Sequence, residues 1–199
     1  IFGLAPMFTY AASHGRLEIC EETEASLAFG LRAQLAGVGF MPGRGWIGTD
    51  LPRLRPDVRT VIDPYSGEEL IAFPAIHPDV AVIHVHESDV YGNCRIKGIS
   101  VSDLDYANAS KKVIITTERL ISNESIKNDP TATRIPFFLV DAVCEVPYGA
   151  YPGTMPYEYF SDENHLRAWI AAEFTSEERH ARRVQKIVEI ESDIVEEGE

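Results

Sequence analysis

The chain has 199 residues, 45% of them hydrophobic and 25% charged, a mixture typical of one globular domain with a short appendage. Its formal net charge of −13 argues against a nucleic-acid partner, because phosphate binding needs clustered Lys and Arg. No apolar run is long enough to span a bilayer, so a membrane partner is not expected either.

The N-terminal part of the chain predicts a helix end, a strand and a second helix. Gly15 stops the first helix, and Leu17–Cys20 reads as a short strand. Residues 23–37 repeat apolar side chains at helical spacing, with glutamates in the first turn where the helix dipole favours them. Residues 40–56, rich in Gly and Pro, predict a loop with structure of its own.

The middle of the chain alternates between strands and helices. Residues 60–76 predict two short strands around a Pro-Tyr-Ser-Gly turn. Residues 79–88 predict a strand that is apolar on both faces in its first half, as in a parallel or mixed sheet. A short helix, a strand over Val113–Thr117 and a strand within 137–150 follow. This alternation predicts an α/β fold with helices packed on a mostly parallel sheet.

The texture changes after Tyr151. An irregular loop is followed by two predicted helices, over 161–173 and 175–192, the second opened by a capping box of Thr175 and Glu178. We therefore expect an α/β domain over 1–160 and a C-terminal helical extension with an acidic tail over 161–199.

Ligands in such folds bind at the carboxyl ends of strands. In this chain those ends are expected to carry the loop 43–48, the turn 87–93 and the loop 147–153.

Two histidines, His84 and His86, lie on one predicted strand and share a face because they are two residues apart. They would suit zinc if His77 or Asp89 joined them, but no third ligand stands at a recognisable spacing. A hydrogen-bonded pair facing a cleft is the preferred interpretation, and no metal is expected. After them Asp89, Gly92 and Asn93 have the composition of a tight turn.

The stretch Pro42–Asp50 has glycines that bring backbone N–H groups close to a phosphate or an acyl oxygen. It is neither a Walker motif nor a dinucleotide fingerprint. An anionic ligand and a solvated loop both fit this stretch.

Glu24 stands at the start of the helix over 23–37, in line with its apolar face. A partly desolvated carboxylate there suits general base catalysis. The alternative is a glutamate of the first helical turn, placed there by the helix dipole. Elsewhere, no serine lies in a Gly-x-Ser-x-Gly elbow. The three cysteines form no CxxC motif, which favours a reducing cytoplasm.

Four segments together carry a resemblance to a known family. They are GFMPGRGWIGTDL, DVAVIHVHESDVYGNCRIKG, KKVIITTERLIS and RIPFFLVDAVCEVPYGAYPGTMPYEYFSDENHL, in this order. The chain resembles the α subunit of family I CoA-transferases, most closely that of the glutaconate CoA-transferase type, from about Glu18 to His165.

The resemblance implies an open three-layer α/β/α fold and a heterotetramer, or larger assembly, with a β subunit. Such enzymes move coenzyme A from an acyl-CoA to a free carboxylate through a glutamate of the β subunit. Coenzyme A is then a substrate, and no permanently bound cofactor is expected. The family's opening strand and Gly-rich turn are absent, and the chain starts at Ile1 without Met, so we expect a segment to precede it.

The resemblance also leaves rival hypotheses open. A related branch hydrolyses a carbon–carbon bond in cyclic CoA-esters, and Glu24 matches its acting base. A non-catalytic scaffold fragment is the third alternative. For the transferase we expect the acyl pocket to be lined by two groups of residues. These are Arg44, Gly45, Gly48 and Thr49, and then His84, His86, Asp89, Gly92 and Asn93.

Overall fold

A computed structural model describes residues 6–164, and the chain divides into two compact units. One unit contains residues 1–18 and 163–199, and the other contains residues 19–162. In the first, helix α1 (Pro6–Ser13) is followed by Gly15 with a φ of 64°, which confirms the predicted helix end. Leu17–Cys20 is irregular, so the predicted strand is wrong. No described strand pairs with it, and an isolated strand is not stable.

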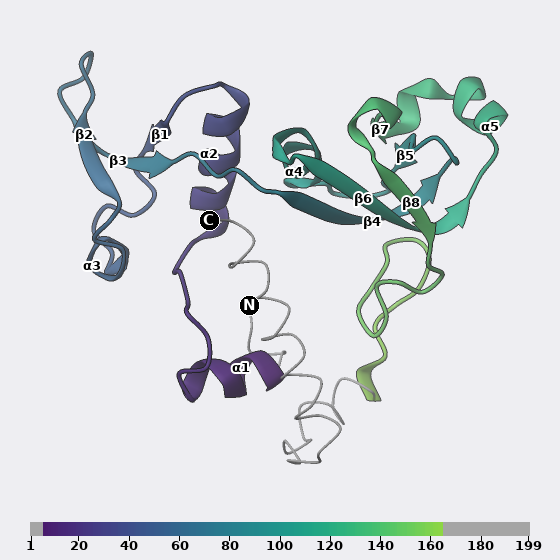
Figure 1. Cartoon of the computed structure of the whole chain (residues 1–199), viewed down its shortest axis with the longest axis horizontal. Coiled ribbons are helices and arrows are strands. Elements are labelled where there is room, and N and C mark those ends of the chain that lie inside the picture. Colours follow the sequence, from purple (N-terminus) through teal and green to yellow (C-terminus); the bar gives the residue numbers. More distant parts are fainter. Residues whose placement is uncertain (1–5, 165–199) are drawn as a thin grey trace, which may run out of the picture. The chain divides into compact units, whose positions relative to one another are not determined.

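Helix α2 (Glu24–Leu35) lies within the range predicted for it (Figure 1). Thr23 caps its N-terminus. The Oγ1 atom of Thr23 accepts from the Ser26 N–H at 3.1 Å, and the Oγ atom of Ser26 accepts from the Thr23 N–H at 2.8 Å. Two backbone donors of the first turn are thereby satisfied.

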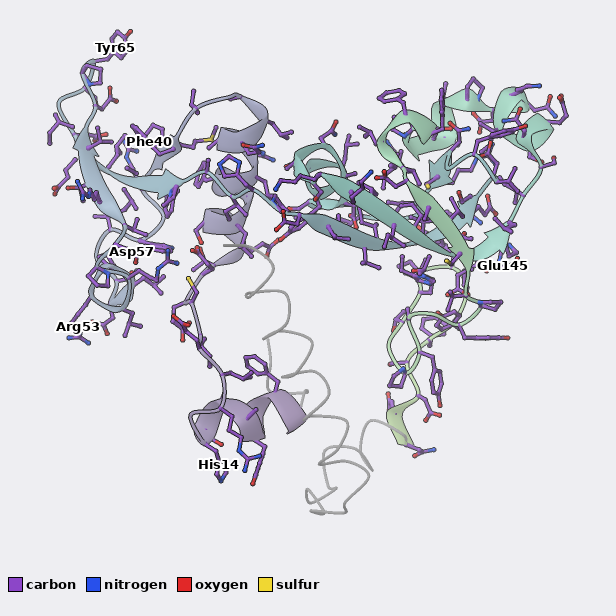
Figure 2. The ribbon with its side chains drawn as sticks, in the orientation of Figure 1. His14, Phe40, Arg53, Asp57, Tyr65 and Glu145 are labelled. Carbon is purple, nitrogen blue, oxygen red and sulfur yellow. The ribbon has the colours of Figure 1, made fainter. Side chains whose placement is uncertain are left out.

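A three-stranded antiparallel sheet packs with α2 in the order β1-β3-β2. Its strands are β1 (Phe40–Gly43), β2 (Arg59–Ile62) and β3 (Glu69–Pro74). Strands β2 and β3 are the pair predicted around the Pro-Tyr-Ser-Gly turn, and Tyr65 points away from the sheet at the tip of this hairpin (Figure 2).

The stretch 40–56 contains more regular structure than predicted, since it includes β1 and the short helix α3 (Leu51–Leu54). Buried Trp46 organises it. The indole packs edge-on against Phe73, with ring centroids 5.2 Å apart, and Nε1 donates to Thr23 Oγ1 at 3.2 Å. An aromatic residue between glycines therefore holds this loop against the sheet.

The second sheet has five strands in the order β7-β5-β4-β6-β8 (Figure 1). They are β4 (Val80–Ser88), β5 (Cys94–Arg95), β6 (Lys112–Leu120), β7 (Thr133–Ile135) and β8 (Ala142–Glu145). Strands β4, β6 and β8 are parallel, whereas β5 and β7 are antiparallel. The predicted α/β class is confirmed. The sheet is mixed because a short turn joins β4 to β5, and only antiparallel neighbours can be joined so tightly.

Helix α4 (Asp103–Ala109) precedes β6 and covers the face of β4 that carries Ala81, Ile83 and Val85. On the other face, Val80 and Val82 are 51% and 66% exposed. Within residues 6–164, the first half of β4 is thus covered on one face and not on two, as was predicted.

Some short elements were not predicted. They are helix α5 (Asn123–Asn128) and the 3-10 turns Pro130–Ala132 and Phe137–Leu139. The predicted helices over 161–173 and 175–192, with the Thr175–Glu178 capping box and the acidic tail, extend beyond the described residues. The domain division at residue 160 stays a prediction. Up to residue 164, no described helix is both long and apolar enough to cross a membrane.

Candidate functional site

Strand β4 places His84 beside Thr116 and Glu118 of β6, its parallel neighbour. The Nδ1 atom of His84 lies 2.9 Å from Thr116 Oγ1, and Nε2 lies 2.8 Å from Glu118 Oε1. Because an ionised carboxylate only accepts hydrogen bonds, Nε2 is the nitrogen that carries the proton. One fifth of the His84 side chain is exposed, at the wall of a cavity of about 490 Å³ formed by residues 80–84 and the start of α4.

Glu118 is the buried centre of this group, with 7% of its surface exposed. Its Oε1 accepts from His84 and from the hydroxyl of Tyr159, and its Oε2 accepts from the Tyr148 N–H at 2.7 Å. Burial acts to raise the pKa of Glu118, but these three hydrogen bonds outweigh it and hold the pKa below its ordinary value. The carboxylate is therefore ionised.

Tyr159 closes the network from the loop that follows β8, beyond Glu145 (Figure 2). Its hydroxyl donates to Glu118 and accepts from the Ala150 N–H at 3.0 Å. Burial, with help from Glu118, raises the pKa of Tyr159 to about 12, so the phenol keeps the proton it donates. Downstream of Met155, Glu158 binds Arg119 of β6 through two hydrogen bonds of 2.6 and 2.8 Å.

Gly149 lies directly against the His84 ring. A Cβ atom built on Gly149 would be 2.4 Å from His84 Cε1, well inside any real contact. The preceding residue, Tyr148, has a φ of 59°, a left-handed conformation unusual for a residue with a side chain. The loop 147–153, expected at the carboxyl end of a strand, thus packs on the imidazole.

His86 has a different role from His84. It is 1% exposed, Nδ1 accepts from the Lys97 N–H at 3.1 Å, and Nε2 donates to the Pro156 carbonyl at 2.8 Å. Both ring nitrogens are used internally. Among residues 6–164, no group of three or more His, Cys, Asp or Glu side chains is arranged to hold a metal ion.

Asp89 builds the turn between β4 and β5. Its Oδ1 accepts from the N–H groups of Tyr91 and Asn93, and its Oδ2 accepts from the side-chain amides of Asn93 and Asn123, at 2.8 to 3.0 Å. Burial acts to raise the pKa of Asp89, but these bonds hold it below its ordinary value. Gly92 has a φ of 99° and would clash with Val140 if it carried a Cβ. In the described structure these residues shape the turn, as the composition predicted.

The Gly-rich loop belongs to the three-stranded sheet. Arg44 is largely exposed and pairs with Glu68. Gly45 and Gly48 are exposed, and the Thr49 hydroxyl donates to the Trp46 carbonyl at 2.8 Å. In the described part of the chain, no hydrogen bond or ion pair joins this loop to the His84 group.

Glu24 is the first residue of α2 and is exposed. The short polar contacts at this helix start belong to its neighbours. Ser26 donates to Glu22, which also pairs with Arg55. The structure thus brings His84 together with Glu118 and Tyr159, but brings none of these to Glu24.

Relatives place the chain in a family. The family model described as "Coenzyme A transferase" matches residues 6–146. The chain belongs to this coenzyme A transferase family. Among curated relatives, this transferase-family chain is 33% identical over 153 residues to the A-type subunit of 3-oxoadipate CoA-transferase of Pseudomonas knackmussii, covering 77% of the chain and 54% of that relative. It is also 31% identical over 180 residues to the cholesterol ring-cleaving hydrolase IpdA subunit of Mycobacterium tuberculosis, covering 85% of the chain and 61% of that relative.

Solved structures agree with this assignment. Glutaconate coenzyme A-transferase from Acidaminococcus fermentans superposes with a TM-score of 0.77 at 29% identity, covering 89% of this chain and 61% of that one. The decarboxylase AibA/AibB superposes with a TM-score of 0.72 at 27% identity, covering 92% and 66%. These matches confirm the predicted resemblance, and the chain spans roughly half the length of the curated relatives it matches.

The sequence analysis missed Glu118. The residue lies in a predicted strand, in KKVIITTERLIS, where a single acid after an apolar run reads as a strand end. One signal was available: Glu118 follows buried Thr117 and is itself buried, which breaks the inward–outward alternation of β6.

Proposed function

We propose that this chain is the A-type, or α, subunit of a CoA-transferase that moves coenzyme A from an acyl-CoA to a free carboxylic acid. The observation that carries the proposal is the family match over residues 6–146, with relatives named as CoA-transferases on both the curated and the structural side. The His84–Glu118 group lies toward the carboxyl ends of parallel strands, where α/β folds place ligands.

In this proposal a B-type partner subunit supplies the nucleophile. A glutamate carboxylate attacks the acyl carbon and expels the CoA thiolate, which gives an anhydride. The thiolate then attacks the glutamyl carbonyl and releases the first acid. The acceptor carboxylate repeats these steps in reverse and leaves as the new acyl-CoA. This chain contributes the wall of the acyl pocket, with His84 as its polar group.

We also assign the surroundings of the reaction. The two kinds of subunit form a heterotetramer or a larger assembly in the cytoplasm. Three unpaired cysteines, Cys20, Cys94 and Cys144, support a reducing compartment. Coenzyme A enters as a substrate and no cofactor stays bound. The charge of −13 supports neither nucleic acid nor membrane as a partner.

The test is to co-express the chain with the B-type subunit of the same organism and to mix the complex with an acyl-CoA and acetate. We expect exchange by the complex and none by either chain alone. Borohydride reduction during turnover labels the thioester glutamate, and we expect the label on the partner. A label on this chain contradicts the assignment, and a complex with no turnover on any thioester supports the scaffold alternative.

The second candidate is a CoA-ester ring-opening hydrolase. It is favoured by the match to the IpdA subunit over 85% of the chain and by Glu24, exposed at the start of α2. Glu24→Gln then abolishes hydrolysis of a cyclic CoA-ester while assembly is kept, because the base is lost. Glu21→Gln, a neighbouring exposed carboxylate, is the matched control. Full activity of the Glu24→Gln complex rules this branch out.

A further inference from the structure

Glu118 is a buried carboxylate without a cationic partner of the usual kind. Among residues 6–164, no Lys or Arg side chain contacts it, and its partners are an imidazole, a phenol and a backbone N–H. Burying a carboxylate is unfavourable unless hydrogen bonds replace water, and here three donors converge to do so. Such an arrangement requires all three donors to be held in place.

The three donors come from different segments. His84 belongs to β4, Tyr148 to the loop after β8, and Tyr159 to the turn that begins at Met155. The Tyr148 N–H points at Oε2 only because its backbone adopts the left-handed conformation. That conformation brings Gly149 against the His84 ring. The same carboxylate thus sets the position of the loop and of the imidazole.

The hydrogen-bond pattern also fixes which nitrogen of His84 is protonated. Glu118 only accepts, so Nε2 carries the proton and Nδ1 accepts from the Thr116 hydroxyl. Thr116 can donate or accept and sets no preference by itself. The choice of tautomer therefore rests on Glu118.

We propose that Glu118 is a positioning residue, which holds the partly exposed His84 imidazole in one orientation and in the Nε2–H tautomer and fixes the Tyr148–Ala150 loop on its face. This role deepens the proposed function and rests on it, since His84 is placed there in the wall of the acyl pocket. Glu118 acts through His84 and does not touch substrate.

Glu118→Gln tests the tautomer. A glutamine keeps the shape but has one oxygen and one NH₂ group. Because the Tyr148 N–H is always a donor, the amide oxygen must face it, and the NH₂ group then faces His84 and Tyr159. His84 Nε2 must now accept, so the proton moves to Nδ1 and is donated to Thr116. We expect the long-range ¹H–¹⁵N spectrum of ¹⁵N-histidine-labelled full chain to change from the Nε2–H to the Nδ1–H pattern, with His84→Gln identifying the signal.

Tyr159→Phe and Glu124→Gln are the controls. Tyr159→Phe removes one donor to Glu118 but leaves the His84–Glu118 bond, so the Nε2–H pattern stays. Glu124→Gln changes an exposed carboxylate on α5 whose partner is Lys127, and neither spectrum nor activity changes. In the complex with the partner subunit, Glu118→Gln lowers kcat by about 10–100-fold, while KM for acyl-CoA changes by less than about threefold.

The outcomes separate the two levels of the argument. An unchanged His84 spectrum in Glu118→Gln overturns the positioning role, whatever the enzyme does. A loss of activity explained wholly by unfolding or failed assembly, with normal kcat per assembled complex, overturns it too. If the wild-type complex transfers no CoA, the proposed function fails, while the tautomer result still decides the role of Glu118.

Discussion

Gly149→Ala adds one methyl group at the place where the loop after β8 meets His84. The new Cβ atom would lie 2.4 Å from Cε1, 2.8 Å from Nδ1 and 2.9 Å from Nε2 of the imidazole. Carbon atoms in contact lie about 3.5–4.0 Å apart. The ring and the loop must therefore separate by about 1 Å. The ring is tied to Thr116 and Glu118, and the loop is tied to Glu118 and Tyr159, so neither moves freely.

Overpacking of this kind costs about 1–3 kcal/mol of folding free energy. For a chain of this size each 1 kcal/mol lowers Tm by about 2–4 °C, so Tm falls by about 2–12 °C. A displacement of about 1 Å of a group at the reacting centre costs about 100-fold in rate, and we expect a loss of that order in kcat.

Differential scanning fluorimetry of the full chain measures Tm, and steady-state transfer by the complex measures kcat. Gly39→Ala is the matched control because no atom lies within 4 Å of its Cβ position and its φ is not positive. We expect that control to be neutral or slightly stabilising. If Gly149→Ala keeps the wild-type Tm and rate, the close packing of Gly149 on His84 is refuted.

Two further predictions concern the turn after β4 and the buried thiol. Asp89→Asn replaces an acceptor that receives four hydrogen bonds with a group that must also donate, so we expect a loss of about 2 kcal/mol in urea unfolding at neutral pH. The folded-state pKa of Asp89 is lowered, so its contribution is fully present above the unfolded value of about 3.9 and is lost as pH falls through the folded value. The difference between wild type and variant must therefore shrink below about pH 4, and a constant difference contradicts this account. Burial raises the pKa of the Cys94 thiol to about 11, so iodoacetamide at mildly alkaline pH should alkylate exposed Cys20 and spare Cys94 until urea unfolds the chain. Equal rates for the two thiols would show that Cys94 is accessible.

The sequence by itself determined the elements whose signal is local. The helical spacing of apolar residues located α2, the Pro-Tyr-Ser-Gly turn located the β2–β3 hairpin, and the Asp, Gly and Asn residues after β4 located the tight turn. Each depends on residues within a few positions of one another, as capping and turn formation do. The family resemblance likewise came from motifs read in order, and the comparisons confirmed it.

Only the tertiary structure decided what the histidines do. His84 and His86 are equivalent by spacing, yet one faces Glu118 at the wall of a cavity and the other is buried between Lys97 and Pro156. Glu118 and Tyr159 stand 34 and 41 residues from their partners, His84 and Glu118. Contacts at such separations depend on how parallel strands pair and how a later loop folds back over them. The burial of a carboxylate is set by those partners and not by its neighbours in the chain.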